Sequence, residues 1–330
     1  MAIIAPEGSA VSVAVIGVAD LDASLRFYRD IIGLKPHPAV TWSGPDFERH
    51  WRLPPGASAQ AVFCELPGVD VGRVLLLAFN AATRKPIRPL DAHMAFGLGN
   101  LNFYTDRIVE DSKRLAALGY RFWSDPIHYT LSGSTGAPTE VVFDGPDTVF
   151  INLVELTSGD PTTRIGQMRA YVETHGRTPT GFTPVVTTSH CVRSMSKAVA
   201  FYEQVLKMGV LIDVVMDRPE QNKFQGLPEK AKTGVKFMQG NHMFGKVALI
   251  YPINYPCMDL VPQAVAPNIG YIAQTFVVKD LSAAKTASDS LKAEVFSSPT
   301  ELEVPGLGRV AAMIVRNPGS GALQQIVQPL

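Results

Sequence analysis

The stretch Asp20-Leu21-Asp22-Ala23-Ser24-Leu25-Arg26-Phe27-Tyr28 has a second copy in the chain, Ser194-Met195-Ser196-Lys197-Ala198-Val199-Ala200-Phe201-Tyr202. In each copy apolar residues recur at the spacing of a buried helix face, at positions 21, 25, 28 and 32 and again at 195, 199, 202 and 206. The dipeptides Leu53-Pro54 and Leu227-Pro228 are separated by the same offset as the two copies. We therefore interpret the chain as a duplication.

Each half divides again into two similar units. In the first half, the runs rich in Val, Leu and Phe predict a strand, a helix and three strands, and then the same order again. The predicted strands are 11–18, 38–41, 59–65 and 74–79 in the first unit and 98–105, 120–123, 139–143 and 149–156 in the second, with a helix at 107–118. The spacing from Asp20 to Asp106 equals that from Ser194 to Asp280. The chain is thus predicted to hold four βαβββ modules.

The domain organisation follows from this repeat. We expect a first domain at 1–156, with modules at about 10–80 and 97–156, and a second at 185–330, with modules at about 185–256 and 268–330. Residues 157–184 form the predicted linker, with Gly and Pro around a short helix at 165–173.

Composition narrows the classes of partner and compartment. Lys plus Arg number 30 and Asp plus Glu number 30, so no net charge attracts nucleic acid or an anionic membrane. No apolar run approaches the roughly 20 residues of a membrane span, and we expect no signal peptide in residues 1–10, which carry no Lys or Arg. Three scattered cysteines favour a reducing cytoplasm. We expect a cytoplasmic protein that binds neither nucleic acid nor membrane, and the sequence leaves homodimer formation open.

The repeated unit resembles the vicinal oxygen chelate superfamily of glyoxalases, bleomycin-resistance proteins and extradiol dioxygenases. The resemblance rests on the run from Val13 to Leu21, the Ser24 to Tyr28 segment with Ile32-Gly33, and the closing Asp144-Gly145-Pro146-Asp147 with Ile151-Asn152-Leu153. It implies an α+β fold in which four βαβββ modules pair into two open cupped β-sheets with the helices outside. In that fold the concave face binds a small molecule.

The metal ligands that the resemblance implies are missing. Relatives that use a metal hold it with a His on one opening strand, a His or Glu on the partner's opening strand and a Glu on a closing strand. The corresponding positions here are Val13, Asn100 and Asn152, and then Thr187, Ala273 and Gln324, or Gln325 in an alternative alignment. Amide and aliphatic side chains are poor ligands for such metals. We predict no catalytic metal and no cofactor, with displaced ligands as the alternative.

Polar residues at these positions are candidates for chemistry without a metal. Asn100 and Asn152 are expected to face each other in one cup, with Asn102 on the same face, where they donate to a carbonyl or phenol oxygen or bond each other. Thr187 and Ser189 share one face of a strand in the second half and, with Gln324, predict a polar second cup.

Other candidates carry two interpretations each. His190 follows Thr187 by three residues, which turns it toward the helix side as a packed histidine, with a pocket role as the alternative. Tyr251 is either a general acid or base at a pocket rim or a surface residue. Trp42 and Trp51, near Phe47 and His50, either cover the cup and stack on a ligand ring or cap the core.

These observations favour an enzyme over a binding protein. The favoured function is a metal-independent lyase, isomerase or hydrolase acting by proton transfer on a small apolar or aromatic catabolic intermediate. The alternatives are a sequestering protein of the bleomycin-resistance type and a metal-dependent dioxygenase with displaced ligands.

Overall fold

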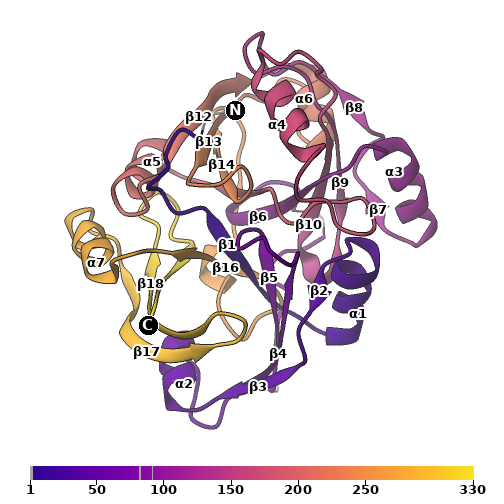
Figure 1. Cartoon of the computed structure of the whole chain (residues 1–330). Helices are drawn as coiled ribbons and strands as arrows, with labels where there is room; N and C mark the ends of the chain where they lie inside the picture. The colour runs from indigo at the N-terminus through magenta and orange to yellow at the C-terminus, as the bar shows by residue number, and fades with distance from the viewer. Residues whose placement is uncertain (1–2, 82, 91) are drawn as a thin grey trace.

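The chain forms two large mixed β-sheets in a computed structural model that describes residues 3–81, 83–90 and 92–330 (Figure 1). The first module contains β1 (Val11–Gly17), α1 (Leu21–Leu25), the π-helical η1 (Arg26–Ile31), β2 (Lys35–Pro36), β3 (Val40–Ser43), α2 (Pro45–Trp51), β4 (Ser58–Glu65) and β5 (Arg73–Phe79). The second contains β6 (Ala95–Tyr104), α3 (Ile108–Ala117), β7 (Arg121–Phe122), β8 (Ile127–His128), β9 (Thr139–Asp144), η2 (Pro146–Thr148) and β10 (Phe150–Glu155).

The second half repeats this order after a linker that carries α4 (Arg164–Val172). The third module contains β11 (Thr187–Cys191), α5 (Met195–Gln204), β12 (Gly209–Met216), α6 (Pro219–Phe224), β13 (Thr233–Gln239) and β14 (Lys246–Pro252). After β15 (Met258–Asp259) and η3 (Val261–Gln263), the fourth contains β16 (Gly270–Val277), α7 (Leu281–Ser290), β17 (Val295–Val304), β18 (Gly308–Arg316) and β19 (Leu323–Pro329). The predicted fold of four βαβββ modules is confirmed.

The duplicated helices begin as their sequences dictate. Asp20, Ser194 and Asp280 are extended residues whose side chains accept a hydrogen bond from the backbone N–H three residues later. This arrangement satisfies a donor that a helix start otherwise leaves unpaired. The apolar faces predicted for the first and third helices are buried at Tyr28 and Tyr202.

The pairing of the modules differs from the expected one. The opening strand β1 pairs antiparallel with β16, and β6 pairs antiparallel with β11. One sheet is therefore built by modules one and four and the other by modules two and three, instead of one sheet within 1–156 and another within 185–330. The physical reason is that every opening strand presents a similar unpaired edge, so a repeated sequence does not say which edges join.

The convex faces of the two sheets carry the main helices. One apolar core joins both sheets through α1, η1 and α3, where Phe27 packs edge-on against Phe103 and Phe143 of the other sheet. A second core joins them through α5 and α7. The two helix pairs lie on opposite flanks of the molecule (Figure 1). The concave faces point away from these cores.

We name the two concave faces by their place in the chain. The terminal cup is the concave face of modules one and four, and the central cup is that of modules two and three. Two short helices that begin at equivalent positions of the repeat, Pro45 and Pro219, lie over them. Helix α2 contacts β17 in the terminal cup, and α6 contacts β8 and β9 in the central cup.

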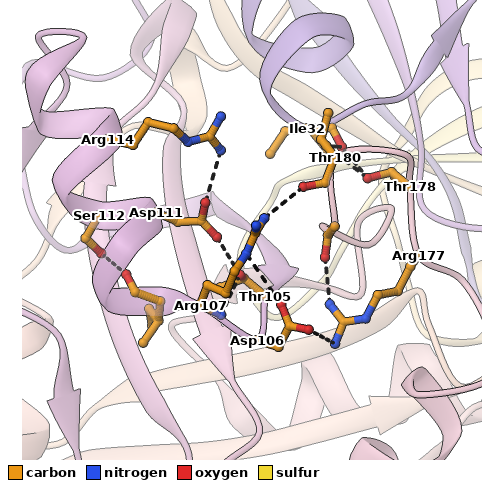
Figure 2. A network of polar contacts seen from close by, with 12 residues as sticks. Ile32, Thr105, Asp106, Arg107, Asp111, Ser112, Arg114, Arg177, Thr178 and Thr180 are labelled. Atoms are coloured by element: carbon orange, nitrogen blue, oxygen red, sulfur yellow. Dashed lines mark hydrogen bonds and ion pairs between the residues drawn. The ribbon is translucent and has the colours of Figure 1, made fainter.

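The linker fastens the first module to the second. The hydroxyls of Thr178 and Thr180 donate to the carbonyl of Ile32 at 2.6 and 2.7 Å, and Arg107 donates to the Thr180 carbonyl at 3.2 Å (Figure 2). Arg177 lies 3.6 Å from the Asp106 carboxylate. In the described part of the chain, no helix is long and apolar enough to cross a membrane.

Candidate functional site

The central cup contains a cavity with two unlike halves. Strands β6, β9 and β10 of the second module supply its polar side, and the third module supplies mainly apolar side chains. The polar lining residues are His93, Asn100, Asn102, Glu140, Asn152, Ser189 and Gln225. The apolar lining includes Val142, Phe150, Met216, Phe224, Val235, Phe237, Ala248 and Ile250. A site of this composition suits a small molecule with an apolar body and one polar end.

Glu140 is the acidic side chain in this lining. The Tyr129 hydroxyl donates to its Oε1 at 2.8 Å, and the Asn152 Nδ2 donates to its Oε2 at 2.6 Å. Burial raises the pKa of the Glu140 carboxyl, and these two hydrogen bonds oppose the rise only in part. The pKa of Tyr129 is raised well above its ordinary value, mainly by burial, so this phenol stays a donor. Glu140 is therefore a carboxyl held by neutral groups.

Asp144, on the same strand, is in the opposite electrostatic situation. Arg88 and Arg121 each donate to its carboxylate at 2.7 Å, and Trp123 Nε1 donates at 3.3 Å. Burial opposes ionisation, but these hydrogen bonds prevail and lower the pKa of Asp144. Asp144 is thus a permanent anion in an ion pair, whereas Glu140 has no cation among its hydrogen-bond partners in the described residues and can exchange a proton.

The asparagines predicted from the sequence do line one cavity, but they do not bond each other across it. Asn100 Nδ2 donates to Asn102 Oδ1, and Ser189 Oγ accepts from the Asn100 backbone N–H at 2.8 Å. Asn152 is buried, and its Oδ1 has no hydrogen-bond partner within the described residues. A buried acceptor without a partner is costly, so this oxygen is suited to a ligand N–H or O–H.

The cavity is closed on one side by an aromatic pair. Tyr129, which follows β8, stacks on Phe224 of α6, with the ring centroids 5.2 Å apart and 15° between the ring planes. The cavity measures about 80 Å³, whereas a cavity that binds benzene measures about 150 Å³. Entry of an aromatic ligand therefore requires lining side chains to move, and we expect Phe224 of the short helix α6 to be one of them.

The terminal cup is filled by its own side chains. Trp42, Phe47 and Trp51 are buried with Val13, Val15, Leu75 and Ala273 in one apolar core. Trp42 and Trp51 therefore cap the core, and Val13 packs inside it. The sequence predicted a binding site at these three residues, but their side chains are buried and do not face a cavity. Their packing follows from the indole rings, which meet at 6.2 Å in a T-shaped arrangement.

His50 occupies the polar centre of this filled cup. Gln325 Nε2 donates to His50 Nε2 at 2.8 Å, and Thr275 donates to Gln325 Oε1 at 2.6 Å. Burial lowers the pKa of His50 to about 3, so its imidazole is neutral. Gln325, rather than Gln324, is the residue that faces the cup.

His190 and Gln324 lie on the helix side of the sheets, outside both cups. His190 bonds Tyr202 at 2.8 Å and Ser320 at 2.5 Å, and Tyr202 also bonds Gln324 at 3.2 Å. Burial lowers the pKa of His190 to about 3. Neither His190 nor Gln324 therefore faces a cup, because the alternation of side chains along a strand turns both toward the helices. The packed-histidine interpretation agrees with these contacts.

Two further candidates lie away from the cavity. Tyr251 is on β14 between Ile250, which lines the cavity, and Pro252, and its side chain is exposed. Strand alternation turns it to the opposite face, which contradicts a role at the rim. Thr187 is buried beside Tyr104, to which it is hydrogen-bonded, and is not among the cavity-lining residues.

The residues present do not fit the divalent metal of the metal-using relatives. At the positions where metal-using relatives carry their His or Glu ligands, the central cup has Asn100, Asn152 and Thr187. In the terminal cup, Val13 and Ala273 stand at such positions and cannot coordinate a metal at all. Nowhere in residues 3–81, 83–90 and 92–330 do three His, Cys, Asp or Glu side chains come together as ligands. The donor set of neither cup therefore suits such a metal.

Sequence reasoning missed Glu140 and Tyr129. The run Glu140-Val141-Val142-Phe143-Asp144 contains a signal, because two acids alternate with residues that favour strands. Alternation places Glu140, Val142 and Asp144 on the face shared with Asn152, whose partner across the ladder is Val142. The ligand pattern of the metal-using relatives covers only opening and closing strands, so an acid on the third strand of a module lies outside it.

Comparison with known proteins supports the fold. The family model "Glyoxalase/Bleomycin resistance protein/Dioxygenase superfamily" matches residues 10–153. Glyoxalase I from Zea mays is similar over 97% of this chain and 92% of its own, with a TM-score of 0.60 and 15% identity. A putative dioxygenase from Bacillus subtilis subsp. subtilis str. 168 is similar over 98% of this chain and 86% of its own, with a TM-score of 0.59 and 14% identity. A search of curated proteins finds no match.

Proposed function

We propose that this chain catalyses proton transfer in its central cup. Its residues 10–153 match the model of the Glyoxalase/Bleomycin resistance protein/Dioxygenase superfamily, and the whole chain has a fold similar to that of glyoxalase I. The substrate is a small apolar or aromatic molecule with a carbonyl or hydroxyl group. The single observation that carries the proposal is Glu140, a carboxyl of raised pKa held by Tyr129 and Asn152 on the wall of a mainly apolar cavity.

Glu140 is the proposed base. A catalytic acid or base works best when its pKa lies near the working pH, and burial moves a carboxyl in that direction. The two neutral donors fix the carboxylate without pairing it to a cation, so it keeps its ability to accept a proton. In the proposed step, Glu140 removes a proton from a carbon next to the substrate carbonyl and later returns it to another position.

The asparagines are the proposed contacts to substrate oxygen. As Glu140 takes the proton, the electron pair of the C–H bond moves toward the carbonyl, and negative charge develops on its oxygen. The Nδ2 group of Asn102 makes no hydrogen bond in the described part of the protein and can donate to that oxygen, while Asn100 orients Asn102. Donors placed where charge develops lower the barrier, typically by about 3 kcal/mol for one donor.

The test is deuterium exchange. Small aromatic ketones and aldehydes are incubated with the protein in D₂O, and proton NMR follows the loss of the signal from the carbon next to the carbonyl. We expect the wild type to accelerate exchange for at least one compound, and Glu140→Gln, which has the same shape, to lower that rate by about 100-fold or more. Asn102→Ala should lower it by a similar or smaller factor.

The matched control is Glu301→Gln. Glu301 is an exposed residue of the other sheet, paired with Arg309, so this variant should exchange at the wild-type rate. Full activity in Glu140→Gln would remove Glu140 from the mechanism. If a compound binds but is recovered with no deuterium at any carbon, the protein would instead be a sequestering protein.

A further inference from the structure

Two of the three cysteines are in contact, although they come from segments that are far apart in the sequence. Cys191 is the last residue of β11, and Cys257 lies directly before β15. Both are free thiols, and the two thiols are hydrogen-bonded to each other. Hydrogen-bonded sulfurs need only a small shift to reach the distance of about 2.05 Å at which a disulfide forms. The first condition for a disulfide, close approach of the two sulfurs, is therefore met.

The backbone holds these two segments together at more than one point. Strands β11 and β15 both pair with β6, at neighbouring positions of that strand. Two residues beyond the cysteines, Arg193 and Asp259 form an ion pair at 2.5 Å. The two segments are thus in contact at two points with the same spacing along the chain. The contact between the thiols follows from this alignment and does not depend on one side-chain rotamer.

The two thiols differ in exposure and in acidity. Cys191 is buried, whereas Cys257 is half-buried between the exposed residues Pro256 and Met258. The hydrogen bond from Cys191 lowers the pKa of the Cys257 thiol, and burial opposes that shift. The same hydrogen bond, together with burial, raises the pKa of Cys191 well above its ordinary value. An accessible thiol of lowered pKa beside a second thiol is typical of cysteines that react with oxidants.

The third cysteine provides the contrast. Cys64 is fully buried in the apolar core that joins the two sheets, and burial raises the pKa of its thiol to about 12. It is the only cysteine of residues 1–156, where Gly17 stands at the repeat position of Cys191. The pair of thiols therefore belongs to the second half of the chain, and Cys64 is a small apolar residue of the core.

We propose that Cys191 and Cys257 form a reversible disulfide when a peroxide oxidises Cys257. The Cys257 thiolate attacks one peroxide oxygen, so that an S–O bond forms, the O–O bond breaks and the other oxygen leaves as hydroxide. This hydroxide takes up the proton that the Cys257 thiol released. Cys191 then attacks the Cys257 sulfur, the S–S bond forms, and the S–O bond breaks to release water with the Cys191 proton. The two thiols lose two electrons, and hydrogen peroxide is reduced to two molecules of water.

This disulfide forms beside the central cup. Ser189, two residues before Cys191 on the same face of β11, lines the cavity, and so does Ile250, the neighbour of Cys191 on β14. The two cysteines themselves are not among the residues that line the cavity. The proposal therefore does not depend on the function proposed for the central cup.

Peptide mapping by mass spectrometry under non-reducing conditions tests the proposal. The folded, reduced protein is treated with hydrogen peroxide at low protein concentration, the remaining thiols are blocked, and the digest is searched for a cross-link between Cys191 and Cys257. We expect this cross-link to form and dithiothreitol to restore both thiols. Cys257 should be oxidised at least about tenfold faster than Cys64.

The matched control is Cys64→Ala, which keeps the pair and should form the disulfide within about twofold of the wild-type rate. In Cys191→Ala the sulfenic acid of Cys257 has no second thiol to react with, so dimedone should trap it. Thermal unfolding shows whether each variant folds.

The wild-type protein alone decides the proposal. It would be overturned if peroxide left both thiols free, or if Cys257 reached the sulfinic acid while Cys191 stayed reduced. A disulfide that joins Cys257 of two copies, or that contains Cys64, would overturn it too, because neither uses the contact seen in the fold.

Discussion

The terminal and central cups are built from the same module, yet one is a core and the other a cavity. The difference lies in two helices at equivalent positions of the repeat, α2 and α6. In the terminal cup, α2 ends with His50 and Trp51, and Trp51 is fully buried among Trp42 and Phe47. In the central cup the residues at the same repeat positions are Phe224 and Gln225, and both line a cavity.

This comparison shows that side-chain volume decides which cup is available to a ligand. A tryptophan fills the terminal cup to the density of a protein interior, which leaves no space for a guest. Gln225 is smaller and is drawn back onto its own helix, where its Nε2 donates to the Gln221 carbonyl at 2.9 Å. The space that remains is next to Glu140, Asn102 and Asn152.

The largest expected effect is on stability. Trp51→Ala removes a buried indole from the terminal core and should lower the free energy of unfolding by about 3–5 kcal/mol. Gln225→Ala, at the same repeat position, should cost about 1 kcal/mol, because it loses one hydrogen bond to the Gln221 carbonyl and a weaker one to the Met216 sulfur beside a cavity. Urea unfolding of both variants measures the difference. Equal losses in the two variants would show that the central cup is packed like the terminal one.

A smaller effect concerns pH. The folded pKa of His50 is about 3, below its ordinary value of 6.5, so between these values the unfolded chain binds more protons than the folded one. Stability should therefore rise with pH across this window and be lost as the pH falls through it. His50→Gln should reduce that slope by up to about 1.4 kcal/mol per pH unit.

The control for this experiment is His175→Gln, which replaces an exposed histidine. Its unfolding free energy should follow the wild-type pH dependence. If His50→Gln kept the full wild-type slope, the imidazole would not be buried in a filled cup, and the contrast between the two cups would be weaker.

Much of the fold was predictable because it depends on local patterns. Helix spacing at Tyr28 and Tyr202 and the runs of strand residues place the modules correctly along the chain. The pairing of β1 with β16 was not predictable, since the opening strands of a repeat offer equivalent edges to one another. The contacts between the two sheets, such as that of Phe27 with Phe103, are not local and cannot be read from the repeat.

The candidate site was predictable where strand alternation determines it. Asn100, Asn102 and Asn152 share one cavity because their parity along β6 and β10 requires it. Ser189 was expected in a separate cup of the second half, but it lines the same cavity because β11 pairs with β6. Gln324 was misplaced by a shift of one residue, which moves a side chain to the opposite face. The sequence left open whether Trp42 and Trp51 cover a ligand or cap the core, and their burial in the terminal core agrees with the second interpretation.

The most direct test of the central claim is a crystal structure of the protein grown with phenol. The account predicts one phenol ring in the central cup, with Phe224 moved away from Tyr129 and the phenol hydroxyl hydrogen-bonded to Asn152 or Glu140. Phenol in the terminal cup, or bound only outside the central cup, would contradict it.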